Sequence, residues 1–180
     1  VLARRHDANK GYERSYKTGL SKDDFIKYFS EICFRSYKDE RLTFTEDEFK
    51  DYFKKLKTDI NADDFLYDIS YNLCMLLKEG RTYHFVHRSF QEYFSAVFIK
   101  EQENKHLKKL GGFFEKHYDG EKSDNTLAML YDMKPSLVET FIFTPFLEEL
   151  LEKCTGEDGY WCFLAQIYSG FYYNGGLENE

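Results

Sequence analysis

The sequence predicts a mainly α-helical fold with one short β segment. Only two prolines and 11 glycines are spread over 180 residues, which disfavours a β-sandwich or barrel because those folds need frequent turn residues. Apolar residues recur at helical intervals through most of the chain, and only the stretch 82–87 alternates as a strand does. The 18 Phe and 15 Tyr residues are expected to supply a core and extensive helix-to-helix or protein-to-protein contact.

Residues 1–20 are polar and basic, and we interpret them as a linker or the end of a preceding helical domain. Because the chain begins with Val, we expect it to be a piece of a longer polypeptide. Ser21 is suited to cap the first helix, and Asp24 completes the cap. The predicted buried stripe of this helix consists of Phe25, Phe29, Ile32, Cys33 and Tyr37.

Two further helices are predicted from their capping residues. Thr45 begins the second helix with Glu48 at the capping-box position, and Asn61 begins the third with Asp64 at the same position. The apolar face of the second helix consists of Phe49, Tyr52, Phe53 and Leu56. The stripe of the third consists of Phe65, Leu66, Ile69, Leu73, Leu76 and Leu77. Gly80 is expected to end the third helix in a left-handed turn.

The β-like segment 82–87 runs directly into another predicted helix. Ser89 stands three residues before Glu92, the spacing of a capping box, so we expect the helix to begin at Ser89. Its apolar residues at helical intervals are Phe90, Tyr93, Phe94, Val97 and Phe98. A helix N-terminus attracts anions, because its first N–H groups are unpaired and its dipole is positive there. His87 and Arg88 therefore lie where a phosphate could bind.

The order of the elements predicts two parts. Three short helices followed by a strand at a Gly-containing turn are typical of a winged-helix domain with a short β-wing, which we place at residues 21–88. Residues 89–180 are expected to form a series of short helices, which we interpret as an α-superhelical segment. The expected helices there are 89–105, 106–117, 126–132, 136–143, 146–154 and 160–173, followed by a Gly-rich tail. Pro135 and Pro145 are expected at the first positions of two of them.

Charge and composition narrow the partners. The formal net charge of −7 argues against nucleic acid or an anionic membrane as the main partner. DNA binding, which a winged helix suggests, is disfavoured further because the third helix carries Asp63, Asp64 and Asp68 against only Lys78. No apolar run approaches the roughly 20 residues that a membrane-spanning helix needs. The four cysteines have no metal-ligand spacing, so we expect all of them to be packing residues in a reducing, cytoplasmic compartment.

Motifs that carry catalysis are mostly absent. The chain has no G-x-x-x-x-G-K-[ST] phosphate loop, no G-x-S-x-G elbow and no H-E-x-x-H zinc motif. His84 and His87 are three residues apart, but strand alternation directs them to opposite faces, which disfavours a shared metal. The sequence therefore predicts no enzyme activity and no metal site for this chain.

Residues 83–96, with the sequence YHFVHRSFQEYFSA, resemble the segment that closes the winged-helix domain of NACHT-type STAND nucleotide triphosphatases, the group that includes the NLR immune receptors. The matching residues are Phe85, His87, Ser89, Phe90, Gln91, Glu92, Tyr93, Phe94 and Ala96. The chain departs from the family pattern at Ser95, where the pattern has alanine. Arg5–Lys10 and the helices of 21–78 also look like the region after the nucleotide-binding core in bacterial members.

The resemblance implies a role for each residue of this segment. It implies that His87 contacts the β-phosphate of bound ADP and holds the closed, inactive state. An imidazole beside a helix N-terminus is chemically suited to donate a hydrogen bond to a phosphate oxygen. The remaining implied roles are packing for Phe85, Phe90, Phe94 and Tyr93, bracing for Gln91 and Glu92, and no binding role for Arg88.

The phosphate-binding lysine and the magnesium-binding acid of the family are absent from this chain. ADP or ATP with Mg²⁺ is therefore expected in the parent protein, whose nucleotide-binding core is the main expected partner, and not in this chain alone. The resemblance suggests a nucleotide-gated switch that couples ligand sensing to oligomerisation in innate-type or antiphage signalling. Two alternatives are a stand-alone helical protein–protein interaction module and a winged-helix DNA-binding regulator.

Overall fold

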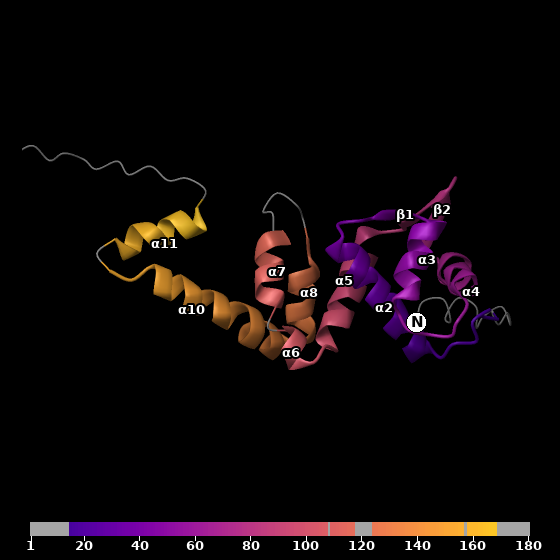
Figure 1. Ribbon diagram of the computed structural model, residues 1–180, viewed down its shortest axis with the longest axis horizontal. Helices are drawn as coiled ribbons and strands as arrows, with labels where there is room; N and C mark the ends of the chain where they lie inside the picture. The colour runs from indigo at the N-terminus through magenta and orange to yellow at the C-terminus, as the bar shows by residue number, and fades with distance from the viewer. Residues whose placement is uncertain (1–14, 108, 118–123, 157, 169–180) are drawn as a thin grey trace, which may run out of the picture.

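The computed structural model describes residues 15–107, 109–117, 124–156 and 158–168. It is mainly helical with a small three-stranded antiparallel sheet, as the sequence predicts (Figure 1). The predicted N-terminal linker, the polar break after residue 118 and the C-terminal tail lie wholly or partly outside the described residues. Within the described part of the chain, no helix has the length and apolar character needed to cross a membrane.

The elements fall into two successive groups along the chain. The first group contains α2 (Lys22–Lys38), β1 (Thr43–Thr45), α3 (Glu46–Lys54), α4 (Ala62–Tyr67), the π-helical turn η1 (Asp68–Asn72), β2 (Leu76–Glu79) and β3 (Thr82–Phe85). The second contains α5 (Arg88–Lys100), α6 (Asn104–Leu107), α7 (Leu110–His117), α8 (Thr126–Met133), α9 (Pro135–Val138), the π-helical turn η2 (Glu139–Phe143), α10 (Thr144–Lys153) and α11 (Gly159–Ile167). Figure 1 shows the sheet at one end of the molecule and α10 and α11 at the other.

The first three helices begin at the residues that the sequence predicts. The hydroxyl of Ser21 accepts a hydrogen bond from the backbone N–H of Asp24. Thr45 and Glu48 form a complete capping box at the start of α3. Asn61 caps α4 by accepting from the N–H groups of its second and third residues. The predicted apolar stripes of α2 and α3 are buried throughout, so both predictions are confirmed.

The third helix is shorter than predicted. It ends at Tyr67, continues as the π-helical turn and gives way to strand β2, so the expected helical stripe is wrong beyond residue 72. Cys74 adopts a positive φ of 53°, which breaks the helical path just before the strand. Leu76–Glu79 then pair with Thr82–Phe85 as a strand. A short apolar run fits either a buried helix or a strand, so the available hairpin partner decides which of the two forms here.

Gly80 has the predicted left-handed conformation, but in a β-hairpin and not at a helix end. Its φ is +59°, and Glu79 pairs with Thr82 across a two-residue loop. Positive φ at the first loop position alone fits a type II′ turn, whose twist matches that of the paired strands. The sheet has the order β1-β3-β2, and its inner face buries Phe44, Leu76, Tyr83 and Phe85.

Aromatic rings form most of the first hydrophobic core, which lies between α2, α3, α4 and the sheet. Phe65 stacks on Phe25 with ring centroids 4.6 Å apart and contacts Phe53 at 5.1 Å. Phe29 and Phe44 both pack against Phe85 from the sheet. The high aromatic content of the sequence is thus explained in part by this core.

Asp68 is fully buried and does not belong to an acidic helix surface, contrary to the sequence prediction. Its carboxylate accepts from the backbone N–H groups of Lys17 and Thr18, each at 3.0 Å, and from the Thr18 hydroxyl at 2.8 Å. The side-chain amide of Asn72 donates to it at 2.7 Å. A buried carboxylate is stabilised when hydrogen bonds replace its hydration. Asp68 therefore fastens residues 15–20 to the end of the third helix.

Helix α5 lies between two hydrophobic clusters, packing along α2 on one side and against α8 on the other (Figure 1). The second cluster consists of Ala96, Ile99, Leu107, Leu110, Phe114, Leu130, Leu137, Val138 and Ile142. The buried residues of α5 are Gln91, Glu92, Ser95, Ala96 and Ile99, and not the predicted stripe of aromatic residues. Because two neighbours cover the helix, polar residues also lie inside, where they need hydrogen-bond partners.

The two prolines of the C-terminal half begin helical segments. Pro135 occupies the first position of α9, as predicted, whereas Pro145 occupies the second position of α10. Proline has no N–H and cannot bond to the carbonyl of Phe141, four residues earlier. The π-helical turn η2, in which the N–H of Thr144 bonds to the carbonyl of Glu139, accommodates this loss without a break in the chain.

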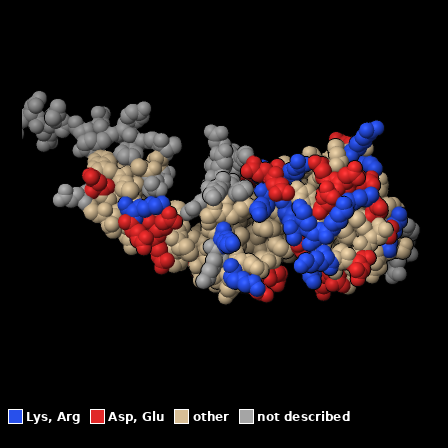
Figure 2. All heavy atoms as spheres, viewed as in Figure 1, with Lys and Arg blue, Asp and Glu red and all other residues tan. Residues whose placement is uncertain are grey.

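Charged side chains are unevenly distributed over the surface. Figure 2 shows Lys and Arg side chains gathered around α2 and α3, interspersed with carboxylates. Lys50 illustrates this mixing, because it pairs with Glu46 at 2.9 Å and with Asp63 at 2.6 Å. Carboxylates predominate over α10 at the other end of the molecule.

Candidate functional site

His87 is the N-cap of α5, and one residue, Val86, separates it from the end of β3. Its backbone is extended, with φ −143° and ψ 136°, and its ring Nδ1 accepts a hydrogen bond from the N–H of Ser89 at 3.1 Å. The Ser89 hydroxyl lies 2.6 Å from the same nitrogen. The prediction that Ser89 caps this helix is therefore wrong by two residues. The imidazole takes the cap position that Ser or Asp usually fills.

This cap determines which ring nitrogen of His87 carries the proton. A neutral imidazole has one accepting and one donating nitrogen, so an accepting Nδ1 places the proton on Nε2. The His87 side chain is exposed, and Nε2 has no hydrogen-bond partner among the residues that the structure describes. His87 therefore offers a neutral N–H donor to solvent at the positive end of a helix.

Arg88 is engaged with its own helix. Its Nε lies 2.8 Å from a carboxylate oxygen of Glu92, whose side chain is almost completely buried. Glu92 thus neither completes a capping box with Ser89 nor faces solvent. The ion pair holds the Arg88 guanidinium along α5. Arg88 is therefore not free to act as a separate anion ligand beside His87.

Gln91 braces α5 against the first group of elements, as the resemblance implies. It is buried, and its side-chain nitrogen donates to the hydroxyl of Ser36 at 2.9 Å and to the carbonyl of Arg41 at 2.7 Å. Ser36 in turn donates to the carbonyl of Cys33 on the same helix, α2. These buried hydrogen bonds fix the first turn of α5, and with it the position of His87.

The aromatic residues of this segment differ in their exposure. Phe85 is buried, and Phe90 and Phe94 pack against the same core, where Phe94 meets Phe29 edge-on at 4.9 Å. Tyr93, in contrast, is 46% exposed and meets Phe94 edge-on at 5.2 Å, so it packs only in part. Val86, beside His87, is also exposed. The surface around His87 is therefore open and partly apolar.

His84 lies near Glu79, with 4.0 Å between its Nε2 and the carboxylate. In the register of the sheet it stands opposite Leu77 and Thr43. Among the described residues there is no group of three or more His, Cys, Asp or Glu side chains that could hold a metal ion.

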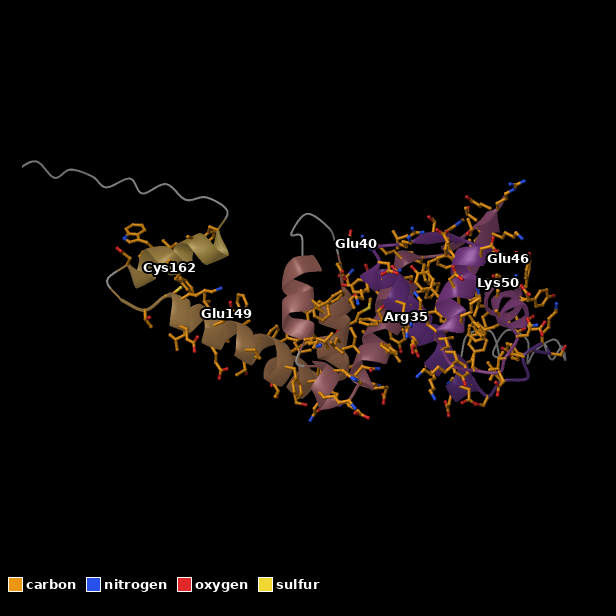
Figure 3. The ribbon with its side chains drawn as sticks, in the orientation of Figure 1. Arg35, Glu40, Glu46, Lys50, Glu149 and Cys162 are labelled. Atoms are coloured by element: carbon orange, nitrogen blue, oxygen red, sulfur yellow. The ribbon has the colours of Figure 1, made fainter. Side chains whose placement is uncertain are left out.

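The cysteines do not all pack as predicted. Cys33 is buried in the core, whereas Cys74 is exposed at its strained turn. Cys154 and Cys162 meet where α10 turns into α11, and burial together with a hydrogen bond from Cys162 raises the pKa of Cys154. Cys162, which Figure 3 shows on α11, also lies 3.2 Å from the carbonyl of Lys153. The sequence did not predict that Cys154 and Cys162 would meet, because a separation of eight residues matches no known cysteine motif.

Comparison with known proteins gives one family match. Residues 131–180 match the model for a short NACHT-associated C-terminal domain, family 14. Within the described residues, the matched segment begins near the end of α8 and includes α9, η2, α10 and α11. No curated protein and no solved structure is similar enough to this chain to count as a match. Residues 131–180 are therefore similar to a NACHT-associated C-terminal domain.

Proposed function

We propose that this chain, which ends in a NACHT-associated C-terminal region, is the regulatory and sensor part of a NACHT STAND ATPase. Two separate segments support this proposal. The motif-like segment 83–96 resembles the end of a NACHT winged-helix domain, and the family match covers the non-overlapping residues 131–180. Agreement between two independent parts of one chain is stronger support than either part alone.

The proposed winged-helix domain comprises residues 21–88, and the proposed superhelical or sensor segment comprises residues 89–180. The order α2, β1, α3, α4, β2, β3 and the sheet order β1-β3-β2 support the winged-helix assignment, because a winged helix places its first strand beside the second strand of a terminal hairpin. In this division α5 belongs to the second part but packs along α2 of the first. A motion of one part would therefore be transmitted to the other through α5.

The observation that carries the proposal is the exposed Nε2 of His87, which bears the ring proton when Nδ1 accepts the cap hydrogen bond. In the proposed mechanism it donates to a phosphate oxygen of ADP held by the nucleotide-binding core of the same polypeptide. Its contact exists only when the core and the winged helix are closed upon each other, so ADP favours the closed state by differential affinity. Exchange for ATP and ligand sensing would then release the winged helix and permit oligomerisation.

The nucleotide with its Mg²⁺ belongs to the core, and this chain supplies a single donor to it. One hydrogen bond to a charged group contributes roughly 1.5–3 kcal/mol, too little to offset the cost of association by itself. The chain alone is therefore proposed to be neither an ATPase nor a nucleotide-binding protein. Isothermal titration of the 180-residue chain with ADP and with ATP should show no binding in the micromolar range.

The test restores the nucleotide-binding core and measures the rate at which the longer polypeptide releases ADP. His87→Ala should release ADP about 10- to 100-fold faster than the wild type, the range expected for the loss of one charged hydrogen bond. His84→Ala is the matched control, because His84 lies three residues before His87 and its ring faces the carboxylate of Glu79 instead. Equal ADP release from the wild type and His87→Ala, with unchanged basal activity, would refute the switch.

The cellular setting of the proposal follows from the resemblance and from the thiols. NACHT proteins of this type act in innate-type signalling, including defence against phage, and we propose the same setting here. The four cysteines are free, which fits a reducing cytoplasm.

A second candidate function is a helical protein–protein interaction module. The exposed apolar side chains of α10 and α11 favour it. The two candidates are compatible, because a sensor segment of a larger protein must itself contact a ligand.

A further inference from the structure

The hairpin formed by α10 and α11 exposes most of its large apolar side chains. Eight of the 15 exposed large apolar side chains among the described residues lie between residues 143 and 168. Leu151, Tyr160 and Leu147 are 69%, 66% and 57% exposed. Leu150 is the one large side chain of the hairpin that is buried, among those that the structure describes. Two short helices with so little shared core gain little stability from each other.

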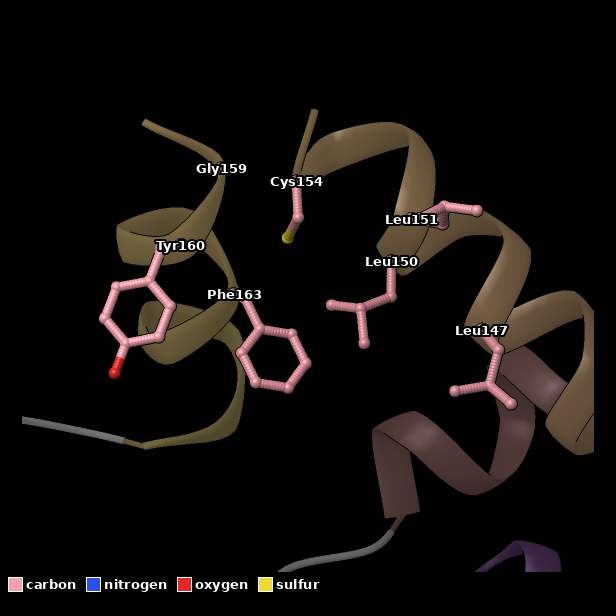
Figure 4. Close-up of a pocket in the computed structure, with 7 residues that line it drawn as sticks. All are labelled: Leu147, Leu150, Leu151, Cys154, Gly159, Tyr160 and Phe163. Atoms are coloured by element: carbon pink, nitrogen blue, oxygen red, sulfur yellow. The ribbon is translucent and has the colours of Figure 1, made fainter. Parts of the chain in front are cut away.

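The apolar side chains converge on a depression of about 390 Å³ between the two helices (Figure 4). Leu150 and Phe163 point toward each other across it, and Leu147 lines it further along α10. Gly159 sets the spacing of the helices, because a Cβ there would lie only 2.2 Å from the carbonyl oxygen of Cys154. Close packing at Gly159 fixes one side of the depression, and the depression is otherwise open to solvent, as is a groove that binds a third helix.

Carboxylates border this apolar surface. The charged side chains described between residues 139 and 168 are five carboxylates and one lysine, and that lysine, Lys153, already pairs with Glu149 at 2.6 Å. Glu148 lies one helical turn before Leu151, at the margin of the apolar face. A second copy of the hairpin, an anionic membrane or a nucleic acid would bring negative charge against this margin. A cationic margin on the partner is complementary.

We propose that the groove between α10 and α11 docks an amphipathic helix of a partner protein whose apolar face is flanked by lysines and arginines. Apolar side chains of the partner helix would fill the depression lined by Leu147, Leu150 and Phe163. Its cationic flanks would face Glu148 and the neighbouring carboxylates of α10. The inference rests on the proposed sensor role of this segment for its biological meaning, but the binding itself involves no nucleotide and no contact with His87.

The test titrates the 180-residue chain with two designed helical peptides that share one leucine face and contain no tryptophan. The first peptide carries lysines beside the leucine face, and the second carries glutamates at the same positions. Trp161 is the single tryptophan of the chain and lies on α11, so its emission reports binding at the hairpin. The lysine peptide should shift that emission to shorter wavelength and bind at least about tenfold more tightly than the glutamate peptide, with a preference that falls as salt is added.

Two variants locate the binding surface. Leu151→Glu changes the most exposed leucine of α10 and should weaken binding of the lysine peptide by at least about tenfold. Leu77→Glu is the matched control, since Leu77 is an exposed leucine on β2, and it should leave binding unchanged. The double variant Glu148→Lys and Glu152→Lys should reverse the preference between the two peptides.

Several results would overturn the proposal. Equal binding of the two peptides, no binding of either, or insensitivity to Leu151→Glu would each show that the groove is not a site for a cationic helix. Concentration-dependent self-association that Leu151→Glu abolishes would assign the surface to a second copy. Binding to vesicles of anionic phospholipid that outcompetes the lysine peptide would assign it to a membrane. None of these results bears on ADP release, so the His87 switch stands or falls separately.

Discussion

The two ends of the molecule use similar amino acids in opposite ways. Around α2, α3, α4 and the sheet, aromatic rings such as Phe29, Phe44 and Phe65 are almost completely buried. In the hairpin of α10 and α11, Tyr160, Trp161 and Phe163 are exposed. The first region has the neighbours needed to enclose its rings, whereas among the described residues α11 packs mainly against α10. Aromatic content therefore predicts contact surface, but it does not predict whether the contact is internal.

The difference also separates two kinds of function. In the first region, the hydrogen bonds of Gln91 fix the first turn of α5, and the cap bond at Nδ1 orients the His87 imidazole before any ligand arrives. The hairpin presents a groove whose occupant would complete its packing. A fixed donor suits a switch that reads a nucleotide, and an open apolar groove suits a surface that awaits a partner.

The largest effect expected from this comparison is on Phe65. Phe65→Ala should lower the free energy of unfolding by about 3–5 kcal/mol, because it removes a fully buried ring that touches Phe25 and Phe53. Phe163→Ala, at a ring of the hairpin that is 38% exposed, should change it by less than about 2 kcal/mol. Urea unfolding followed by circular dichroism measures both. Similar losses in the two variants would remove the distinction between the regions.

A smaller loss is expected at Asp68. Asp68→Ala removes a buried carboxylate and leaves the N–H groups of Lys17 and Thr18 without their acceptor, so it should cost about 2–3 kcal/mol. Amide exchange at residues 17 and 18 should quicken at the same time. Asp63→Ala removes an exposed carboxylate on the same helix and should cost less than about 1 kcal/mol. If the two variants unfold alike, Asp68 does not fasten the segment that precedes α2.

The next effect depends on pH and involves Tyr52. Burial and a 2.9 Å hydrogen bond to Asp39 raise the pKa of Tyr52 to about 12. The unfolded chain releases this proton near the ordinary value of about 10, so the folded state binds more protons between the two values and stability falls as pH rises through that window. Tyr52→Phe should remove this part of the alkaline loss, and at neutral pH it should cost about 1 kcal/mol.

Tyr71→Phe serves as the control for the alkaline measurement, because Tyr71 is exposed. It leaves the hydrogen bond between Tyr52 and Asp39 in place, so the alkaline loss of stability that Tyr52 causes should remain. An alkaline profile of Tyr52→Phe identical to that of the wild type would contradict the account of Tyr52.

The smallest effect on stability is expected at Leu151. Leu151→Glu should change the free energy of unfolding by less than about 0.5 kcal/mol, because the side chain is largely exposed. Thermal unfolding of this variant beside the wild type measures the change. A large destabilisation would mean that the hairpin is already covered, and the groove would then not be free to dock a helix.

Local rules predicted much of this fold from the sequence. Ser21, Thr45 and Asn61 each begin a helix because their side chains reach the free N–H groups two or three residues ahead. The switch to strand at Leu76 could not be predicted from its own residues, since its pairing partner, β3, decides it. The burial of Asp68 was hidden for a similar reason, because its main partners are 50 and 51 residues away.

The candidate site was predicted in part. The sequence indicated a helix start and a histidine beside it, and the resemblance singled out His87. That His87 itself caps the helix was missed, because Ser89 with Glu92 gave the more usual capping signal. Glu92 is instead buried and pairs with the partly exposed Arg88, and its burial depends on the neighbouring helices that cover α5.

The central claim is that the fold presents His87 as a neutral donor through Nε2. Nitrogen-15 NMR of the imidazole in the 180-residue chain, at a pH where the ring is neutral, identifies the protonated nitrogen directly. A proton on Nε2 and a bare Nδ1 are expected, and Ser89→Pro, which removes the N–H that Nδ1 accepts from, should abolish this preference. A proton on Nδ1 in the wild-type chain would contradict the account, because Nε2 would then be unable to donate to a phosphate.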